Sequence, residues 1–486
     1  MRLSFYPIIT NMSQSGVYKW SFIDRVSLAV INFGVNIALA RMLTEADFGL
    51  LAMISLFVAV AYDLSSCGLS DGLIHKARPT ETDYSTVFIF NAAFGLFFGL
   101  LFFFTAPLTA RFFGHQELIG IMRVLGVCFF LQTMSYVQET RLRKQLRMKA
   151  ICIVRVGATL TVSILAIIVA ALGYGYWALV CTQLLLSAFF FIYYTIASKW
   201  FPRLRFSVKA FKEFFSYGVH LAISYLATIV GRNVNTFILG RLYPTPALSG
   251  VYYQGAKLAN VPFNIGEYSL NSTFFVVASN EEDPERQRHL VREMFSIIVG
   301  INILIMMFMI AISAPGIEFL YGTKWLASIP ILRILAVAEC LVCIRAFFAT
   351  ICKIHGRTIF VRNIGFIELG IQLLLLLIFC RYGLNVIAWT QAGGVACAVL
   401  IYAVSCRRHM GMSLRSIAAT FVGTIWLPLL AAAAGIIASS LTPAGAFLRC
   451  IVTTTAFFFI TVTLGQLFRV PAYITLKNKL LRKRKA

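Results

Sequence analysis

Residues 86–106 read TVFIFNAAFGLFFGLLFFFTA, a stretch of 21 residues without a charged side chain. About 20 apolar residues in a helix are enough to cross the hydrocarbon core of a bilayer. Over the 486 residues, 59% are hydrophobic and only 13% are charged, whereas charged residues make up about 25% of a soluble globular domain. The composition therefore excludes an ordinary soluble enzyme and a disordered or collagen-like chain, and it indicates a polytopic membrane protein.

Apolar runs of spanning length recur along the whole chain. There are fourteen, at residues 22–41, 48–68, 86–106, 118–138, 151–172, 174–197, 214–240, 247–277, 294–314, 328–351, 363–380, 384–405, 417–438 and 446–468. The runs at 214–240 and 247–277 are longer and more polar than the others, so we expect a kink at Pro262 and exposure to a cavity. The sequence thus predicts an all-α membrane protein with about 14 transmembrane helices.

The basic residues support an even number of spans. With the N-terminus placed in the cytoplasm, 30 of the 43 Lys and Arg residues fall in cytoplasmic loops and ends, and 6 fall in the loops on the opposite side. Short cytoplasmic loops of membrane proteins are enriched in Lys and Arg, so we expect both termini in the cytoplasm. The formal net charge of +24 then reflects topology and contact with anionic membrane lipids, and we expect no nucleic-acid partner.

Several motifs occur twice, shifted by 208 or 210 residues. They are Ala106-Pro107 with Gly114 and Ala314-Pro315 with Gly322; Ile121-Met-Arg123-Val-Leu125 and Ile331-Leu-Arg333-Ile-Leu335; and Gly175 before Thr182-Gln183 and Gly383 before Thr390-Gln391. The matched helices run in the same direction, which predicts a parallel duplication of six helices. The expected segments are a cytoplasmic N-terminal segment (1–20), a first six-helix bundle (21–198), a basic cytoplasmic linker (199–213), a second six-helix bundle (214–405), helices 13 and 14 (406–468) and a basic cytoplasmic tail (469–486).

The sequence lacks the motifs of catalysis, metal binding and nucleotide binding. Cys340 and Cys343 form a C-x-x-C inside an apolar run without a second Cys pair, which favours buried thiols. The nearest approach to a phosphate-binding P-loop, Gly250 to Gly255, continues with Ala256. The predicted outer loops are short and hold no paired carboxylates or Ser/His/Asp set. We therefore expect no enzymatic activity, no cofactor, no metal and no ATP hydrolysis.

Three segments resemble a known family. They are Arg41-Met-Leu-Thr-Glu-Ala-Asp-Phe-Gly-Leu-Leu-Ala-Met53, Gly68-Leu-Ser-Asp-Gly-Leu-Ile-His-Lys76, and Gly240-Arg241 leading to Gly250-Val-Tyr-Tyr253, Lys257-Leu258 and Pro262. They are similar to segments of bacterial polysaccharide exporters, the O-antigen and exopolysaccharide (colanic-acid-type) flippases of the multidrug/oligosaccharidyl-lipid/polysaccharide exporter superfamily. The resemblance covers most of residues 20–410. Glu45 stands where the family pattern has Pro, and Asn235 stands where relatives often carry an acid, which argues against an ion-coupling carboxylate at position 235.

The resemblance implies two bundles around a central cavity and a polyprenyl-diphosphate-linked oligosaccharide as cargo. Such a transporter would flip the cargo from the cytoplasmic to the periplasmic leaflet of the bacterial inner membrane by alternating access, for lipopolysaccharide or exopolysaccharide synthesis. Its partners could include a polysaccharide polymerase and glycosyltransferases. The alternatives are a multidrug or organic-cation antiporter on the same fold, a peptidoglycan-precursor lipid flippase, and a membrane polymerase or ligase.

Arg232 and Lys257 are the first candidates for binding the diphosphate. They lie 13 and 12 residues from position 245, so we expect them at the same level of one helical hairpin, with no acid at that depth in the hairpin. A basic residue at mid-membrane costs about 2.5–3.5 kcal/mol on insertion scales, which makes it a candidate functional residue, and arginine donates paired hydrogen bonds to phosphate oxygens. The alternative is that both side chains snorkel outward or meet a carboxylate of another helix.

Arg25 is a third candidate for the diphosphate. It also lies near the level of Asp63, so the two could form a gate at the inner side or a structural ion pair. Arg345 and Glu368 lie 12 and 11 residues from position 357, which predicts a structural ion pair.

The remaining charges within the apolar runs have weaker assignments. Glu267 and Glu339 are gate or ion-coupling candidates, since burial disfavours a charged carboxylate and could make either one a proton site. Arg123 and Arg333 occupy equivalent places in the two repeats near the outer surface, where they could snorkel to headgroups or line the cavity rim.

Overall fold

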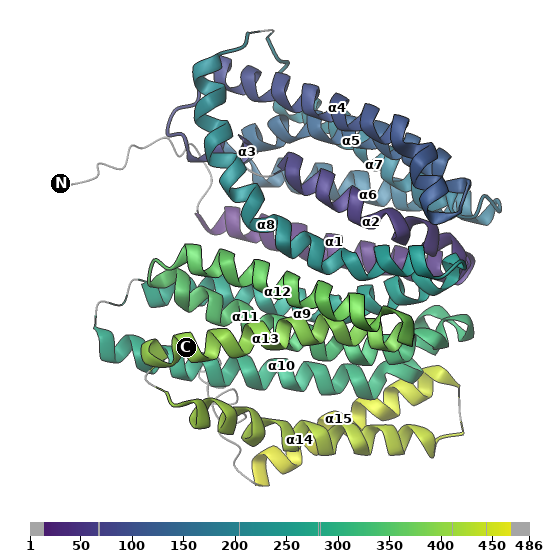
Figure 1. Cartoon of the computed structure of the whole chain (residues 1–486), viewed down its shortest axis with the longest axis vertical. Coiled ribbons are helices and arrows are strands. Elements are labelled where there is room, and N and C mark those ends of the chain that lie inside the picture. Colours follow the sequence, from purple (N-terminus) through teal and green to yellow (C-terminus); the bar gives the residue numbers. More distant parts are fainter. Residues whose placement is uncertain are drawn as a thin grey trace. The chain divides into compact units, whose positions relative to one another are not determined.

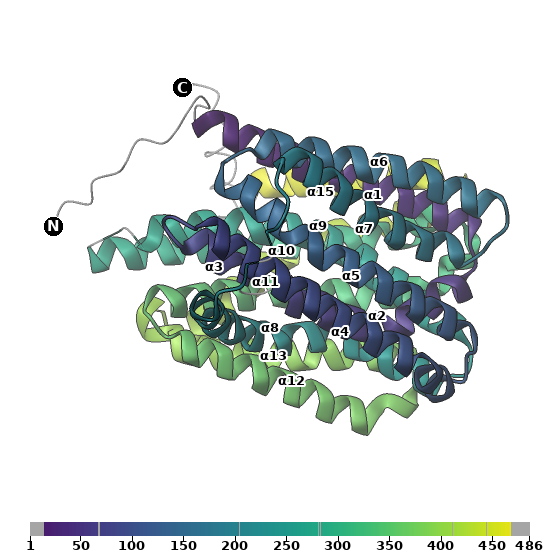
Figure 2. The ribbon, with the colours of Figure 1, turned by 90° about the horizontal axis from the view of Figure 1, so that it is seen from above.

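The structure is a computed structural model, which describes residues 14–66, 69–203, 205–279, 281, 283–410, 412–443 and 445–467. This part of the chain folds into fifteen α-helices and two short 3-10 helices. The chain divides into two compact units, Met1–Ile229 and Val230–Ala486, and the division falls within the long helix α8. Figures 1 and 2 show the helices from two directions.

Unit 1 consists of seven α-helices and the first part of an eighth. Their bounds are α1 (Gln14–Met42), α2 (Glu45–Ser66), α3 (Leu69–His75), α4 (Glu81–Phe113), α5 (Glu117–Lys144), α6 (Met148–Ala171), α7 (Trp177–Ser198) and α8 (Val208–Leu242). The central helix is α5, which packs against α2, α3, α4, α6 and α7. Close approach of α4 and α5 depends on small residues, because a Cβ atom on Gly126 would lie 2.7 Å from the carbonyl oxygen of Gly99.

Unit 2 contains the end of α8 and all later helices. Their bounds are α9 (Pro246–Ser279), α10 (Pro284–Tyr321), η1 (Thr323–Ser328), α11 (Ile329–Ile354), α12 (Thr358–Phe379), η2 (Cys380–Tyr382), α13 (Leu384–Met410), α14 (Leu414–Ser440) and α15 (Ala446–Leu467). The central helix is α11, which packs against α9, α10, α12 and α13. The last two helices pack on each other and on α10.

Each of the fourteen predicted runs corresponds to one helix, and these helices have between 22 and 38 residues. In the part of the chain that the structure describes, twelve of them are long and apolar enough to cross a membrane. The other two are α8 and α9, the same two runs that are more polar in the sequence. The protein is therefore an all-α multi-pass membrane protein with twelve candidate spans in its described part.

The helices extend beyond the apolar runs, and α10 shows why. It begins at Pro284, ten residues before the predicted run, and its first turns carry several charged residues. The Asp283 side chain accepts a hydrogen bond from the backbone N–H of Glu285, and proline is favourable in the first helical turn. Helix α9, in which we expected a kink at Pro262, runs from Pro246 to Ser279 as a single assigned helix.

The two units repeat one packing pattern. In unit 1, α5 packs on α4 and α7, and α6 packs on α7; in unit 2, α11 packs on α10 and α13, and α12 packs on α13. The glycines of the repeated motifs also have matching positions. Gly114 and Gly322 end α4 and α10 with φ values of 81° and 92°, and Gly175 and Gly383 precede α7 and α13 with φ values of 54° and 107°. These positive φ values favour glycine over any residue with a Cβ atom.

Candidate functional site

A group of buried polar side chains joins four helices of unit 2. The Nδ2 atom of Asn235 in α8 donates to the hydroxyl oxygen of Tyr252 in α9 (2.9 Å) and to the carbonyl oxygen of Ile387 in α13 (3.1 Å). From α12, Gln372 Nε2 donates to the carbonyl oxygen of Gly231 (2.8 Å) and to Asn235 Oδ1 (3.2 Å). Asn235, Tyr252 and Gln372 are all at most 3% exposed. We call these three side chains the amide cluster; it joins α8 to α9, α12 and α13 by hydrogen bonds that have no competition from water.

An ion pair lies one helical turn from the amide cluster. Glu368 precedes Gln372 by four residues on α12, and its Oε2 atom lies 3.1 Å from Nη1 of Arg345 on α11. Both side chains are mostly buried. The prediction that Arg345 and Glu368 form a pair is therefore confirmed.

Arg232 lies on α8 beside the contact between α8 and α12. It follows Gly231, whose carbonyl oxygen accepts the hydrogen bond from Gln372, and its charge acts on the Glu368 carboxylate. The Arg232 side chain is exposed on the surface of the described part of unit 2. A carboxylate from another helix, one of the alternatives for this arginine, thus lies within electrostatic range.

Lys257 is the second diphosphate candidate, on α9. Its side chain is exposed, and Nζ lies 5.8 Å from the centre of the Tyr253 ring, a cation–π arrangement. The hydrogen bond between Asn235 and Tyr252 holds α8 and α9 together in the same hairpin.

The predicted inner gate falls partly outside the described residues. The side chain of Asp63 is among those that the structure does not describe, and Arg25 is exposed on α1. Its neighbour Asp24 is buried instead, and Oδ2 of Asp24 lies 2.9 Å from Nη1 of Arg155 on α6. Sequence reasoning missed this pair because the two residues are 131 positions apart. The charge of Arg155 within an apolar run was the signal that a partner was needed.

Of the two ion-coupling candidates Glu339 and Glu267, the structure describes the side chain of Glu339 only. Glu339 on α11 is 2% exposed, and its charge acts on Tyr252 of the amide cluster. The side chain of Glu267 lies outside the described residues.

The two arginines at equivalent repeat positions contact equivalent helices. The guanidinium carbon of Arg123 on α5 lies 4.7 Å from the centre of the Phe103 ring on α4. Arg333 on α11 donates from Nε to the hydroxyl oxygen of Ser313 on α10 (2.8 Å). Each arginine thus contacts the residue twenty positions earlier, and Arg123 is exposed whereas Arg333 is half-buried.

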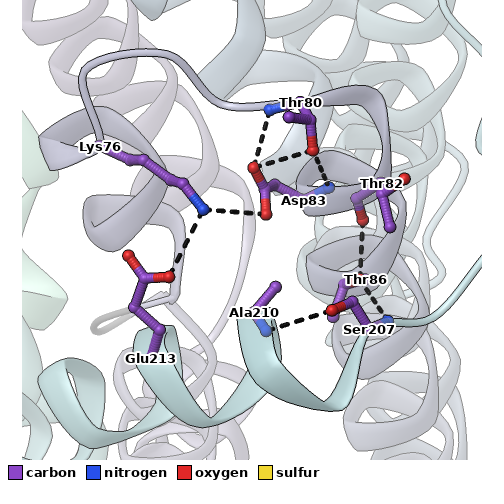
Figure 3. A network of polar contacts seen from close by, with 8 residues as sticks. All are labelled: Lys76, Thr80, Thr82, Asp83, Thr86, Ser207, Ala210 and Glu213. Carbon is purple, nitrogen blue, oxygen red and sulfur yellow. Dashed lines mark hydrogen bonds and ion pairs between the residues drawn. The ribbon is translucent and has the colours of Figure 1, made fainter.

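A second polar network, in unit 1, is one that sequence reasoning did not find (Figure 3). Lys76 Nζ lies 3.1 Å from Asp83 Oδ1 on α4 and 3.4 Å from Glu213 Oε2 on α8. Asp83 also forms a capping box with Thr80 at the start of α4. The spacing Thr80-x-x-Asp83 was a local signal for this helix start.

The ionic state of Lys76 is secured by its two partners. Partial burial of the amine lowers its pKa, but the hydrogen bond and the charge of Asp83, together with Glu213, outweigh that effect and raise the pKa above its usual value. Lys76 therefore stays charged at physiological pH and fastens the loop before α4 to the beginning of α8.

Within the described residues, no group of three or more His, Cys, Asp or Glu side chains is placed to hold a metal ion. The chemical resources of the candidate site are guanidinium, ammonium, amide and carboxylate groups. These groups bind anions and sugar hydroxyls by hydrogen bonds and charge.

Comparisons with known proteins identify the family. The model of the family described as "Polysaccharide biosynthesis protein" matches residues 38–330. The teichuronic acid biosynthesis protein TuaB of Bacillus subtilis (strain 168) is 26% identical over 403 residues, which are 82% of this chain and 80% of that protein. The lipopolysaccharide biosynthesis protein WzxC of Escherichia coli (strain K12) is 22% identical over 326 residues, which are 66% and 65% of the two chains.

Among solved structures, the lipid II flippase MurJ in an inward closed conformation has the same fold. Its TM-score is 0.73 at 14% identity, and the match covers 93% of this chain and 99% of that one. The family model covers more than half of the present chain. This protein therefore belongs to the polysaccharide biosynthesis protein family, the bacterial polysaccharide exporters that its motifs resemble.

Proposed function

We propose that this protein flips a polyprenyl-diphosphate-linked oligosaccharide from the cytoplasmic to the periplasmic leaflet of the bacterial inner membrane, by alternating access, for surface polysaccharide synthesis. Its family membership and its relatives in teichuronic acid and lipopolysaccharide biosynthesis support this role. The flippase fold supports movement of a lipid-linked cargo. A diphosphate carries about two negative charges and cannot cross hydrocarbon without fixed cations around it.

The observation that carries the proposal is the position of Arg232. Arg232 lies within the long helix α8 of a membrane protein, and its side chain is exposed. The buried amide cluster holds the backbone beside it. A charge at such a position is costly unless it is used. A fixed guanidinium group suits the phosphate oxygens of the proposed cargo, to which it can donate two parallel hydrogen bonds.

The other predicted residues complete the proposed pathway. Lys257 and Arg25 join Arg232 in binding the diphosphate, and Arg123 and Arg333 line the rim through which the sugars pass. Asp63, Glu267 and Glu339 are the candidate gate or ion-coupling groups.

The proposed topology has fourteen spans, with both termini in the cytoplasm. Helices α1, α2 and α4–α7 form the first six-helix bundle, α8–α13 form the second, and α14 and α15 are appended. The shared packing pattern and the matching glycines of the two halves support the duplication. The inside-negative membrane potential favours outward movement of an anion by about 2.3 kcal/mol per charge per 100 mV. The proposed drive is therefore this potential, with a proton or sodium gradient as a further source.

The experiment is deletion of the gene followed by complementation in the bacterium that carries it. We expect the deletion strain to lose surface polysaccharide and to accumulate the lipid-linked oligosaccharide. The wild-type gene should restore export, and Arg232→Gln combined with Lys257→Gln should not. Full export by that double variant, at equal protein abundance, would contradict the assignment of the diphosphate site.

The same strains separate the alternative functions. Altered drug sensitivity with normal surface polysaccharide would indicate a multidrug antiporter. Loss of growth with accumulation of peptidoglycan precursor would indicate a flippase for that lipid.

A further inference from the structure

Three charged side chains from three helices of unit 2 form a cluster with a surplus of positive charge. They are Arg232 of α8, Arg345 of α11 and Glu368 of α12. Arg345 Nη1 lies 3.1 Å from Glu368 Oε2, and the charges of both arginines act on the Glu368 carboxylate. Arg345 thus pairs with Glu368, and Arg232, beside the contact between α8 and α12, lies within electrostatic range of the same carboxylate, so two basic side chains and one acidic side chain gather here.

The backbone around this cluster is held in register. Gln372, one turn after Glu368, donates its hydrogen bond to the carbonyl oxygen of Gly231, directly before Arg232. On the opposite side, α13 approaches α12 closely, since a Cβ atom on Gly394 would lie 3.1 Å from the carbonyl oxygen of Glu368. The helices that carry Arg232 and Glu368 therefore cannot move apart without breaking buried hydrogen bonds.

Hydrogen bonding within the cluster is incomplete. Among the described residues, Arg345 Nε has no hydrogen-bond partner, and Glu368 Oε2 accepts no well-aligned hydrogen bond although it is within ion-pair distance of Arg345. A guanidinium group has five N–H donors. The buried Nε of Arg345 is therefore a donor without an acceptor in the described part of the chain. Arg449, which pairs with Glu318, also has an Nε without a partner among these residues, so the second arginine, Arg232, is what distinguishes this cluster.

We propose that Arg232 and Arg345 together form a phosphate-binding site, and that Glu368 is its resident counter-anion, which the phosphate displaces. This inference rests on the proposed diphosphate cargo. It assigns a binding role to Arg345, for which the sequence predicts only a structural ion pair with Glu368. Glu368 keeps the two guanidinium groups together when no cargo is bound. It also competes with the phosphate, which weakens binding enough for the cargo to be released.

The test uses the full-length protein in lipid nanodiscs and inorganic pyrophosphate as the probe, with affinity measured by isothermal titration calorimetry. Removal of the competing charge by Glu368→Gln should tighten pyrophosphate binding about tenfold. Removal of either guanidinium group, by Arg232→Gln or Arg345→Gln, should weaken it about tenfold. Glu318→Gln is the matched control, because Glu318 forms an ion pair with Arg449 (2.6 Å) elsewhere in the same unit. This control should not change the affinity.

The double variant Arg345→Gln with Glu368→Gln separates binding from structure. It lacks the ion pair, as Glu368→Gln does, and differs from that variant only in the Arg345 charge. The proposal predicts pyrophosphate binding at least about tenfold weaker than in Glu368→Gln alone. Equal affinity of the two variants would overturn the role of Arg345, and unchanged or weaker binding in Glu368→Gln would overturn the role of Glu368.

Failure of this phosphate site can be told apart from failure of the proposed flippase function, because different experiments report on the two. Undetectable pyrophosphate binding by both the wild type and Glu368→Gln would overturn this site. The export measurement in the deletion strain reports on the proposed function independently. Thermal unfolding of every variant in nanodiscs shows whether a lost affinity reflects a lost fold.

Discussion

Each unit has a mostly buried ion pair on an equivalent helix, α6 in unit 1 and α12 in unit 2, but the partner helix differs. In unit 1 the acid is on α1 and the arginine on α6, where Asp24 pairs with Arg155. A second arginine close to Asp24, Arg143, has its own carboxylate in Glu139, 2.6 Å away. In unit 2 the acid is on α12 and the arginine on α11, where Glu368 pairs with Arg345, and Arg232 of α8 lies within electrostatic range of the same carboxylate.

This difference in charge arrangement suggests a structural role for the ion pairs of unit 1 and an anion-binding role for the charged residues of unit 2. In unit 1 the charges of three arginines act on Asp24, and two of them, Arg155 and Arg143, have an ion-paired carboxylate, which suits a structural role for these two. In unit 2 Glu368 pairs with Arg345 and is within electrostatic range of Arg232, and among the described residues the Nε donor of Arg345 has no acceptor. The repeated fold therefore supplies two similar scaffolds, and the anion site that we propose uses two arginines of the second, Arg232 and Arg345.

The largest expected loss of stability comes from removing Arg155, the ion-pair partner of the buried Asp24. We expect Arg155→Leu to destabilise the protein by about 3–5 kcal/mol, because Asp24 is left buried without its direct ion-pair partner. Arg345→Leu should cost less, because Arg232 remains to balance Glu368. The measurement is thermal unfolding of both full-length variants in the same detergent. A larger loss of stability for Arg345→Leu than for Arg155→Leu would contradict the view that Arg232 helps to balance the charge of Glu368.

The amide cluster provides the next comparison. Gln372→Leu removes the donor from the Gly231 carbonyl and from Asn235 Oδ1, and an unsatisfied buried group costs about 1–3 kcal/mol. The matched variant is Ser163→Ala on α6, the corresponding helix of unit 1, where the hydroxyl group donates only to Thr159 of its own helix. Thermal unfolding should show a clear loss for Gln372→Leu and a change within about 0.5 kcal/mol for Ser163→Ala. Equal losses of stability in the two variants would show that the hydrogen bonds of the amide cluster between helices contribute no more than a hydrogen bond within one helix.

The network around Lys76 should matter for stability and not for anion binding. Lys76→Met removes two charged contacts, so we expect a loss of about 1–2 kcal/mol in stability and unchanged pyrophosphate affinity. The exposed Lys353, replaced by Met, is the control and should change neither quantity.

The pH dependence of this contribution follows from the raised pKa of Lys76. A raised pKa means that the stabilisation is fully present below the ordinary lysine value of about 10.4 and is lost as the pH rises through the higher value in the folded protein. The stability difference between wild type and Lys76→Met should therefore be constant from about pH 6 to 9. A difference that decreased across this range would contradict the assignment.

The smallest effect is expected where unit 1 departs from unit 2 at a helix start. Helix α2 begins with Glu45, whereas α9 begins with Pro246. Proline at the first helical position stabilises by about 0.4–1 kcal/mol through the unfolded chain, and loss of an acidic residue from the first turn costs about 0.3–1 kcal/mol. Glu45→Pro should thus leave the unfolding temperature nearly unchanged. A large decrease would mean that Glu45 has a contact beyond its helix.

Hydropathy predicted the long helices, because each apolar run must form a helix to satisfy its backbone in lipid. Hydropathy could not predict the short helices α3, η1 and η2, which have 3 to 7 residues and lie between the runs. It also placed the start of α10 ten residues late, because a helix that continues into water carries charged residues that hydropathy reads as a loop.

The site was predictable where helix geometry sufficed. Counting residues from a shared turn brought Arg345 and Glu368 to the same level, since both helices leave the same loop. The same count could not find Asp24 with Arg155, whose helices are separated by four others in the chain. The amide cluster was equally out of reach, because Gln372 and Asn235 are 137 positions apart and neither is charged.

The central claim is that Arg232 and Lys257 of unit 2 bind the phosphate of a lipid-linked glycan while it crosses the membrane. The most direct test reconstitutes the full-length protein in proteoliposomes with the lipid-linked oligosaccharide extracted from the same bacterium. An imposed diffusion potential drives transfer, and a lectin reports the glycans that reach the other leaflet. We predict transfer by the wild type and transfer at the protein-free rate by Arg232→Gln with Lys257→Gln. Transfer by this double variant at the wild-type rate would contradict the account.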